Sequence, residues 1–265
     1  NFSLPATSKY VTDRRQGRFY PSGASDFSPN GVRTARVLLS GDGGWVDPSS
    51  LRVSFKIESA GANALYLASG RHCLIERVRI FCAGILVEDV GPHYGRLHEL
   101  FHPRLMPQNH NVNQGVLNGT MFHNPGYFLT SYNMEAAPIA AGYTATAMMP
   151  IACGFLKTGK MLPVRYAPVQ VEITFANAED AVVLDPGQHS GGAAAAAGSR
   201  QYIIRQLSVT GAQSRLDSAL EQNFANVLLS NRALTVPIRT IATQAQTVPN
   251  DFTSFQISTV RALSR

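Results

Sequence analysis

The chain has 265 residues and a formal net charge of +6, and only 15 % of its residues are charged, against about 25 % in an average globular domain. Its 23 Lys and Arg residues are scattered and form no polybasic tail, which argues against a dedicated nucleic-acid-binding protein. The sequence shows no signal or transit peptide and no apolar run long enough to span a bilayer. Low charge together with 22 Gly and 15 Pro favours a loop-rich β protein whose neutral surface is covered by other subunits.

The three cysteines, Cys73, Cys82 and Cys153, show no C-x-x-C spacing. They predict reduced, buried thiols in a protein made in a reducing compartment. The chain begins with Asn1 and stops at Arg265 inside a strand-like pattern, so we expect a processed or partial chain.

Residues 1–34 are polar and contain three arginines followed by Phe19-Tyr20. This composition predicts an extended arm that orders against a neighbour, or a floppy terminus. Residues 36–39 form a short strand candidate, and Leu51 to Ile57 alternate apolar and polar side chains, which predicts a strand with one buried face. Residues 74–82 and 85–90 are two further strands joined by the Ala83-Gly84 turn, and together they predict a hairpin.

After Gly91-Pro92, apolar residues at 94, 97, 101 and 105 predict one face of a short helix. A long Asn-, Gly- and Pro-rich connection follows over residues 107–141, and residues 169–175 form the clearest alternating strand of the chain. Beyond a Gly/Ala-rich stretch, residues 202–209 predict a strand and Leu216 to Leu228 an amphipathic helix, with further strands at 236–238 and 252–258. This order weakly repeats the earlier one and suggests an internal duplication.

The segment His98-Glu99-Leu100-Phe101-His102 matches the H-E-x-x-H pattern of zinc peptidases, in which two histidines on one helix face bind the metal. Position 105 is Leu and position 108 is Gln, so the longer three-histidine form is absent. Pro103 directly follows the second histidine and disfavours helix there. A non-catalytic metal on His98, His102 and a third histidine (one of His93, His110 or His123) is a second alternative. We favour a short surface helix whose histidines contact a neighbouring subunit, with no catalytic, cofactor or metal site.

A hairpin from Arg77 to Asp89 runs into Tyr94 and a short leucine-bearing helix, and Leu162-Pro163-Val164 precedes the strand Val169 to Phe175. This order of elements resembles the major capsid proteins of tailless icosahedral double-stranded DNA viruses, the lineage of virophages, polinton-like viruses and nucleocytoplasmic large DNA viruses. The resemblance implies an all-β fold of antiparallel jelly-roll β-sandwiches, two in tandem, with short helices.

The domains implied by the resemblance are an extended arm (1–34), a first jelly roll (35–180), a Gly/Ala-rich linker or loop (181–200) and the start of a truncated second jelly roll (201–265). Only about 65 residues follow the proposed boundary, too few for a complete second barrel. Either the chain is truncated, or a single jelly roll carries an elaborated carboxyl region.

The resemblance also implies a function: a non-enzymatic capsid subunit that forms homotrimeric capsomers around a DNA genome. Its partners would be neighbouring capsomers, minor capsid and vertex proteins, and genomic DNA through non-specific contact. Its location would be the virion, after assembly in the host cytoplasm or nucleus. The alternatives are a β-sandwich module that binds carbohydrate or a receptor, for which the single Trp45 offers a poor aromatic site, and the zinc metallopeptidase.

Overall fold

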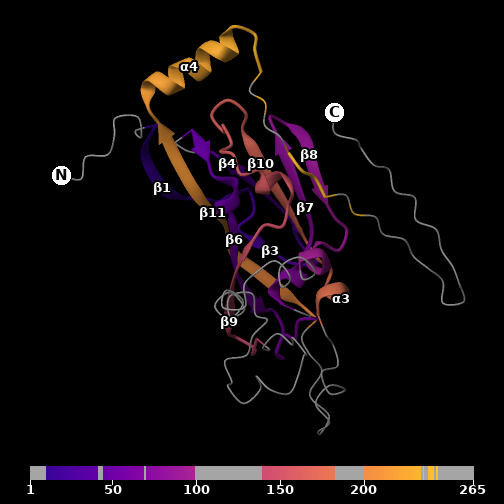
Figure 1. Cartoon of the computed structure of the whole chain (residues 1–265). Helices are drawn as coiled ribbons and strands as arrows, with labels where there is room; N and C mark the ends of the chain where they lie inside the picture. Colours follow the sequence, from indigo (N-terminus) through magenta and orange to yellow (C-terminus); the bar gives the residue numbers. More distant parts are fainter. Residues whose placement is uncertain are drawn as a thin grey trace, which may run out of the picture.

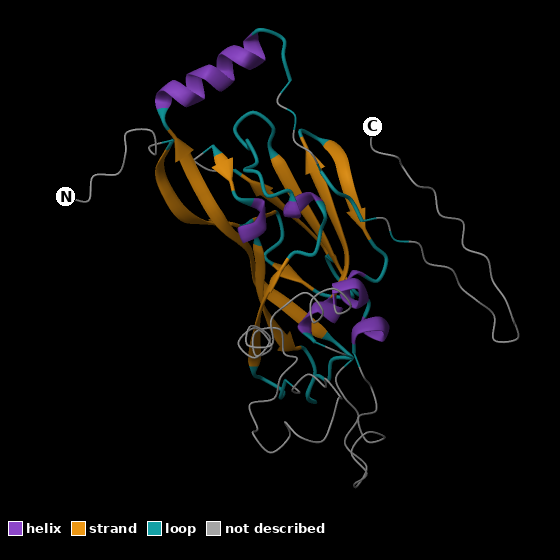
Figure 2. Cartoon of the chain, in the orientation of Figure 1, coloured by secondary structure: helices purple, strands orange, loops and turns teal. Residues whose placement is uncertain are grey.

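Two antiparallel sheets pack face to face in the computed structural model (Figures 1 and 2). The structure describes residues 10–40, 44–68, 70–98, 139–182, 200–233, 235, 238–241 and 243. The β11 sheet has the strand order β1-β11-β6-β9, with two short strands beside β11. Its members are β1 (Val11–Phe19), β3 (Asp26–Phe27), β5 (Trp45–Val46), β6 (Arg52–Ser59), β9 (Thr144–Pro150) and β11 (Tyr202–Leu216).

The second layer, the β10 sheet, has the order β2-β4-β10-β7-β8. Its members are β2 (Pro21–Ser22), β4 (Thr34–Leu39), β7 (Ile75–Cys82), β8 (Ile85–Val90) and β10 (Val169–Phe175). Successive long strands switch between the two sheets, from β4 to β6 and again from β6 to β7. This arrangement is a jelly roll, as expected from the sequence.

Alternation of side chains explains the sandwich. In β6, Val53, Phe55 and Ile57 are buried while the residues between them are partly exposed. Phe175 of β10 contacts Phe55 of β6 and Phe27 of β3, with ring centroids 5.9 and 5.5 Å apart. Because these three rings come from both sheets, they join the two layers at the centre of the core.

One helix is longer than the others. The longest is α4 (Ser218–Leu229), which begins after Asp217, whose carboxylate accepts a hydrogen bond from Ala219 N at 3.2 Å. The predicted helix after Gly91-Pro92 is confirmed for residues 94–98, and its continuation lies outside the described residues. The short helices are η2 (Pro48–Ser50), η3 (Arg71–Leu74), η5 (Phe155–Lys157) and α3 (Ala178–Ala181). Within the described ranges, none of the helices is both long and apolar enough to cross a membrane.

Two of the expected domain boundaries are corrected by the strand pairing. Residues 11–19, expected in an extended arm, form β1, which pairs with β11 from Val11↔Leu216 to Phe19↔Val209. Residues 202–216, expected to open a second barrel, form β11, which also pairs with β6 and therefore lies at the centre of the same sheet. One jelly roll thus extends from β1 to β11.

The remaining predictions of secondary structure are partly confirmed, partly wrong and partly untested. The hairpin of β7 and β8 and the strands β6 and β10 are confirmed. Residue 238, expected in a strand, is not part of one. The Gly/Ala-rich stretch at 183–199 and the strand expected at 252–258 lie outside the described residues.

Candidate interaction surfaces and buried polar sites

The candidate metal ligand His98 is buried, with 1 % of its surface exposed. Its Nε2 lies 3.1 Å from the carbonyl oxygen of Pro150, and its ring stacks on that of His72 at 5.1 Å. A carbonyl oxygen can only accept, so Nε2 carries the proton and cannot bind a metal in this arrangement. His98 also cannot contact a neighbouring subunit, which corrects the expectation of a surface histidine.

The rest of the H-E-x-x-H segment, including Glu99 and His102, lies outside the described residues. Among the residues that are described, no three His, Cys, Asp or Glu side chains are grouped so that they could hold a metal ion. His102 as a metal ligand stays a prediction.

Glu88 of β8 is a buried carboxylate that binds backbone N–H groups from two distant segments. Its Oε1 accepts hydrogen bonds from Gly154 N and Ile241 N, both at 2.8 Å, and its Oε2 accepts one from Phe155 N at 2.7 Å. Only 3 % of Glu88 is exposed. The three donors replace the water that the carboxylate loses on burial.

We call residues 238–241 and 243 the C-terminal strap. The hydrogen bond from Ile241 N to Glu88 holds this strap against the sandwich. A Cβ atom on Gly154 would lie 2.3 Å from the carbonyl oxygen of Arg239, so the strap passes too close for any other residue. Thr243 anchors the end of the strap, because its hydroxyl accepts a hydrogen bond from Gly91 N at 3.1 Å and donates one to Gly91 O.

Near Glu88, Tyr94 and Cys153 are buried and neutral. The Tyr94 hydroxyl accepts a hydrogen bond from Ala152 N at 2.7 Å. Burial raises the pKa of Tyr94 and the pKa of Cys153 well above their ordinary values, and the nearby charge of Glu88 adds to both shifts. Burial also raises the pKa of the half-exposed Cys82. None of the three cysteines is in a disulfide, and at Cys153 a raised pKa means a packing role, since reactive thiols have lowered values.

The outer face of the β10 sheet carries a charged row across four strands. Glu172 of β10 is paired with Arg36 of β4, Nε to Oε2 at 2.8 Å, and with Arg79 of β7. Beside Arg79 in register lies Asp89 of β8, which pairs with Arg77. The side chain of Glu172 is 3 % exposed, whereas that of Arg36 is 63 % exposed. The carboxylate is therefore covered by two arginines that themselves face solvent.

A second row on the same face is largely apolar. The register places Gln170 beside Leu38 on one side and Phe81 on the other, and Phe81 beside Leu86. Leu38 and Leu86, at opposite ends of this row, are each 47 % exposed. With Phe81 between them, these leucines form the apolar part of this face.

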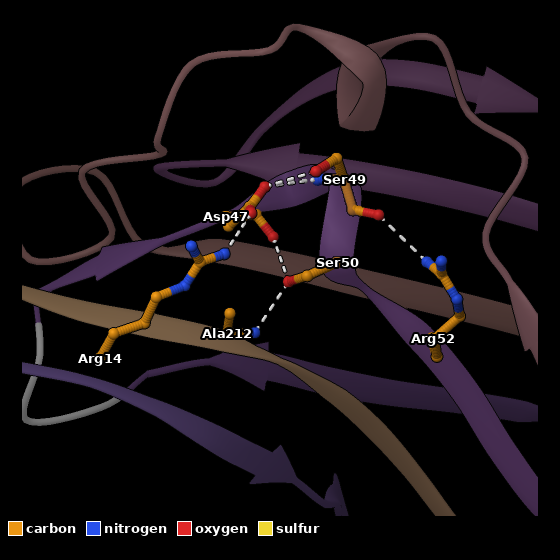
Figure 3. A network of polar contacts seen from close by, with 6 residues as sticks. All are labelled: Arg14, Asp47, Ser49, Ser50, Arg52 and Ala212. Carbon is orange, nitrogen blue, oxygen red and sulfur yellow. Dashed lines mark hydrogen bonds and ion pairs between the residues drawn. The ribbon is translucent and has the colours of Figure 1, made fainter.

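On the opposite layer, a polar network joins β1, β11 and the bend between β5 and β6 (Figure 3). Arg14 pairs with Asp47 at 2.9 Å, and the Asp47 carboxylate accepts hydrogen bonds from Ser49 N and Ser49 Oγ at 3.1 and 2.6 Å. Ser50 Oγ donates to Asp47 O and accepts from Ala212 N, both at 2.7 Å. The network fixes edge strand β1 and leaves Arg14 largely exposed.

Helix α4 protrudes from one end of the sandwich (Figure 1) and none of its residues is buried. Phe224 contacts Trp45 with ring centroids 5.0 Å apart, and Glu221 pairs with Arg165 at 3.0 Å. Trp45 is only 7 % exposed and lies between Phe224 and Tyr166. It therefore offers no open aromatic face to a sugar ring.

Known structures share this arrangement. A quasi-atomic model of the PBCV-1 virus capsid matches with 17 % identity and a TM-score of 0.52, over 85 % of this chain and 48 % of that one. The crystal structure of PBCV-1 VP54 fitted into a reconstruction of the virophage Sputnik matches with 15 % identity and a TM-score of 0.51, over 85 % and 48 %. The Faustovirus major capsid protein matches with 9 % identity and a TM-score of 0.51, over 82 % and 56 %.

The fold is that of viral capsid proteins. The resemblance seen in the sequence is thereby confirmed at the level of the fold. The chain spans about half the length of the capsid chains it matches. No family model matches the sequence, and no curated protein is significantly similar to it.

Sequence reasoning missed both of the buried carboxylates. Glu88 and Glu172 each stand in a strand of mostly apolar residues, where a glutamate is expected on the solvated face. Glu172 does point to the outer face, and arginines on both neighbouring strands cover it. Arg36 and Arg79 are close to Glu172 in space but far from it in the sequence. The sequence around Glu172 therefore gives no sign that the residue is covered.

Proposed function

We propose that this chain is a structural subunit of an icosahedral viral capsid, acts by self-association and performs no catalysis. The observation that carries the proposal is the jelly roll, which matches capsid structures over 82–85 % of the chain. Low charge and exposed apolar side chains such as Leu38, Ile85 and Leu86 on the sandwich surface support it, because a shell subunit must contact several neighbours.

The finer parts of the proposal concern assembly. We infer homotrimeric capsomers that contact neighbouring capsomers and minor capsid and vertex proteins. In the full protein a second jelly roll would follow the C-terminal strap, since the matched capsid chains are about twice as long. The strap supports this inference, because it fixes the direction in which the chain leaves the first barrel.

Contact with genomic DNA would be non-specific. Arg14 and Arg18 of β1 and Arg205 of β11 are exposed on the β11 sheet and contribute to the net charge of +6. Scattered arginines attract a polyanion without reading its sequence. The protein would reside in the virion after assembly in the host cytoplasm or nucleus.

Mass measurement in solution tests the proposal. Purified protein, examined by mass photometry and negative-stain electron microscopy, should form trimers or shell-like particles. A protein that stays monomeric and binds glycans would contradict the capsid function and favour the carbohydrate-binding alternative. Stoichiometric zinc that is lost in His98→Ala, together with peptidase activity, would favour the peptidase.

A further inference from the structure

We propose that the outer face of the β10 sheet binds the same face of a second copy of this chain, about a two-fold axis parallel to the strands. The inference rests on the proposed self-assembly and names one of its contacts. The surface consists of two rows that cross β4, β10, β7 and β8, which lie side by side in that order (Figure 1).

The charged row alternates in sign across the sheet. In strand order it reads Arg36, Glu172, Arg79 and Asp89, and the register of the three strand pairs places these residues next to one another. All four side chains leave the outer face, because the residues on either side of each in its strand point into the core or toward it.

A two-fold axis between β10 and β7 reverses the order of the four strands in the second copy. Each row of one copy then faces the same row of the other copy. Arg36 then faces Asp89 of the second copy, and Glu172 faces its Arg79. The exposed Arg36 therefore meets a carboxylate of the second copy at each end of the row, and in the middle each copy presents a Glu172 that its own Arg36 and Arg79 already neutralise. The same strand order in both copies would place Arg36 against Arg36. Self-complementarity of this kind is the requirement for a contact between identical surfaces.

The apolar row obeys the same symmetry. Leu38 on β4 faces Leu86 of the second copy, and Gln170 faces its Phe81. The two leucines are 47 % exposed in the single chain, so the contact would remove apolar surface from water at both ends of the row. Sheets packed face to face with nearly aligned strands are a common arrangement in β proteins.

The contact is small. Four strands spaced about 4.8 Å apart give a width of roughly 19 Å, and two rows of alternate residues, at about 3.3 Å per residue, give a length of roughly 13 Å. The product is roughly 250 Å² per copy, about a third of a standard interface. Such a contact is weak between two isolated chains. It fits a repeated contact between subunits of a larger assembly, where many copies act together.

Two substitutions of exposed leucines test the symmetry without touching the ion pairs or the core. Leu38→Glu places a carboxylate against Leu86 of the second copy, twice in each contact, and Leu86→Lys does the same with an ammonium group. Sedimentation velocity over a range of concentrations then follows the step that doubles the mass of the smallest stable species. Leu229→Glu, on an exposed residue of α4, is the matched control for added charge.

Each single variant should weaken the doubling step at least about tenfold, and Leu229→Glu should leave it unchanged. An equimolar mixture of Leu38→Glu and Leu86→Lys protein should regain it, because each mixed contact has one Glu–Lys pair and one native Leu–Leu pair. Single variants that associate like the wild type, a mixture that does not recover, or a wild type without this step would each overturn the contact.

These outcomes separate the two proposals. Wild-type trimers or particles that lack the doubling step, or that tolerate both substitutions, contradict only the sheet contact. A wild type that forms no assembly of any kind contradicts the capsid function as well.

Discussion

Glu88 accepts hydrogen bonds from three backbone N–H groups, two at the start of η5 and one in the C-terminal strap. In Glu88→Ala these donors stay in a site that water reaches poorly, and each unsatisfied group costs about 1–3 kcal/mol. We expect the free energy of unfolding, measured by urea denaturation, to fall by about 3 kcal/mol or more. Hydrogen exchange at the Ile241 amide should accelerate, because the strap loses its anchor.

Two controls accompany this change. Glu88→Gln keeps one acceptor oxygen and should lose less stability than Glu88→Ala. Glu179→Ala, at an exposed position of α3, should change the free energy of unfolding by less than about 0.5 kcal/mol. Equal stability of Glu88→Ala and the wild type would show that the carboxylate does not hold the strap.

The role of Glu88 is not predictable from its strand. Glu88 and Asp89 are adjacent in β8, so only one of them can face solvent in a regular strand. The choice depends on a register slip between Ile80 and Phe81 of the neighbouring strand. The slip leaves Val87 as the extra residue and turns Glu88 inward opposite Ile80. A bulge reverses the face of the residues beyond it, and nothing in the local sequence marks its position.

At the scale of elements, α4 contributes no buried residue to the core, and its Phe224 contacts Trp45 with ring centroids 5.0 Å apart. Phe224→Ala should release the helix locally. Trp45 is the single tryptophan, so its fluorescence reports the change directly. We expect a red shift of the emission as water reaches the ring, with a loss of less than about 2 kcal/mol in the free energy of unfolding, because α4 contributes no buried residue.

Leu229→Ala is the matched control on the same helix, since Leu229 is 83 % exposed and should leave the emission unchanged. If Phe224→Ala unfolds the whole sandwich instead, α4 is part of the cooperative core. An unshifted emission would mean that another residue covers Trp45.

The elements also show how far the sequence predicts the fold. Strands β6 and β10 were predictable because the apolar and polar residues of each alternate along the sequence. The β7–β8 hairpin was predictable because the Ala83-Gly84 turn separates two strand-like runs. Strand β1 was not predictable, because it is an edge strand that buries little except Phe19. Its exposed arginines are equally typical of a flexible arm. Strand β11 was recognised as a strand but placed in another barrel. Its partners β1 and β6 lie about 150 residues or more away in the sequence, and periodicity carries no information about pairing.

For the whole molecule, buried neutral acids set the response to alkaline pH. Burial raises the pKa of Tyr94, Cys153 and Tyr202 in the folded chain. In the unfolded chain these groups release their protons near pH 9 for Cys and pH 10 for Tyr. Above those values the unfolded chain binds fewer protons than the folded one, so the free energy of unfolding must fall as the pH rises.

We therefore expect a stability that is independent of these groups below about pH 8 and declines above about pH 9, by up to about 1.4 kcal/mol per pH unit for each group. Urea denaturation at several values between pH 7.5 and pH 10.5 measures the slope. Cys153→Ala removes one of the three groups, so its stability should decline less steeply between pH 9 and pH 10 than that of the wild type. A constant stability up to pH 10.5, or an unchanged slope in Cys153→Ala, would mean that these acids ionise in the folded protein. Water would then reach the side chains of Tyr94, Cys153 and Tyr202, which are buried in the structure.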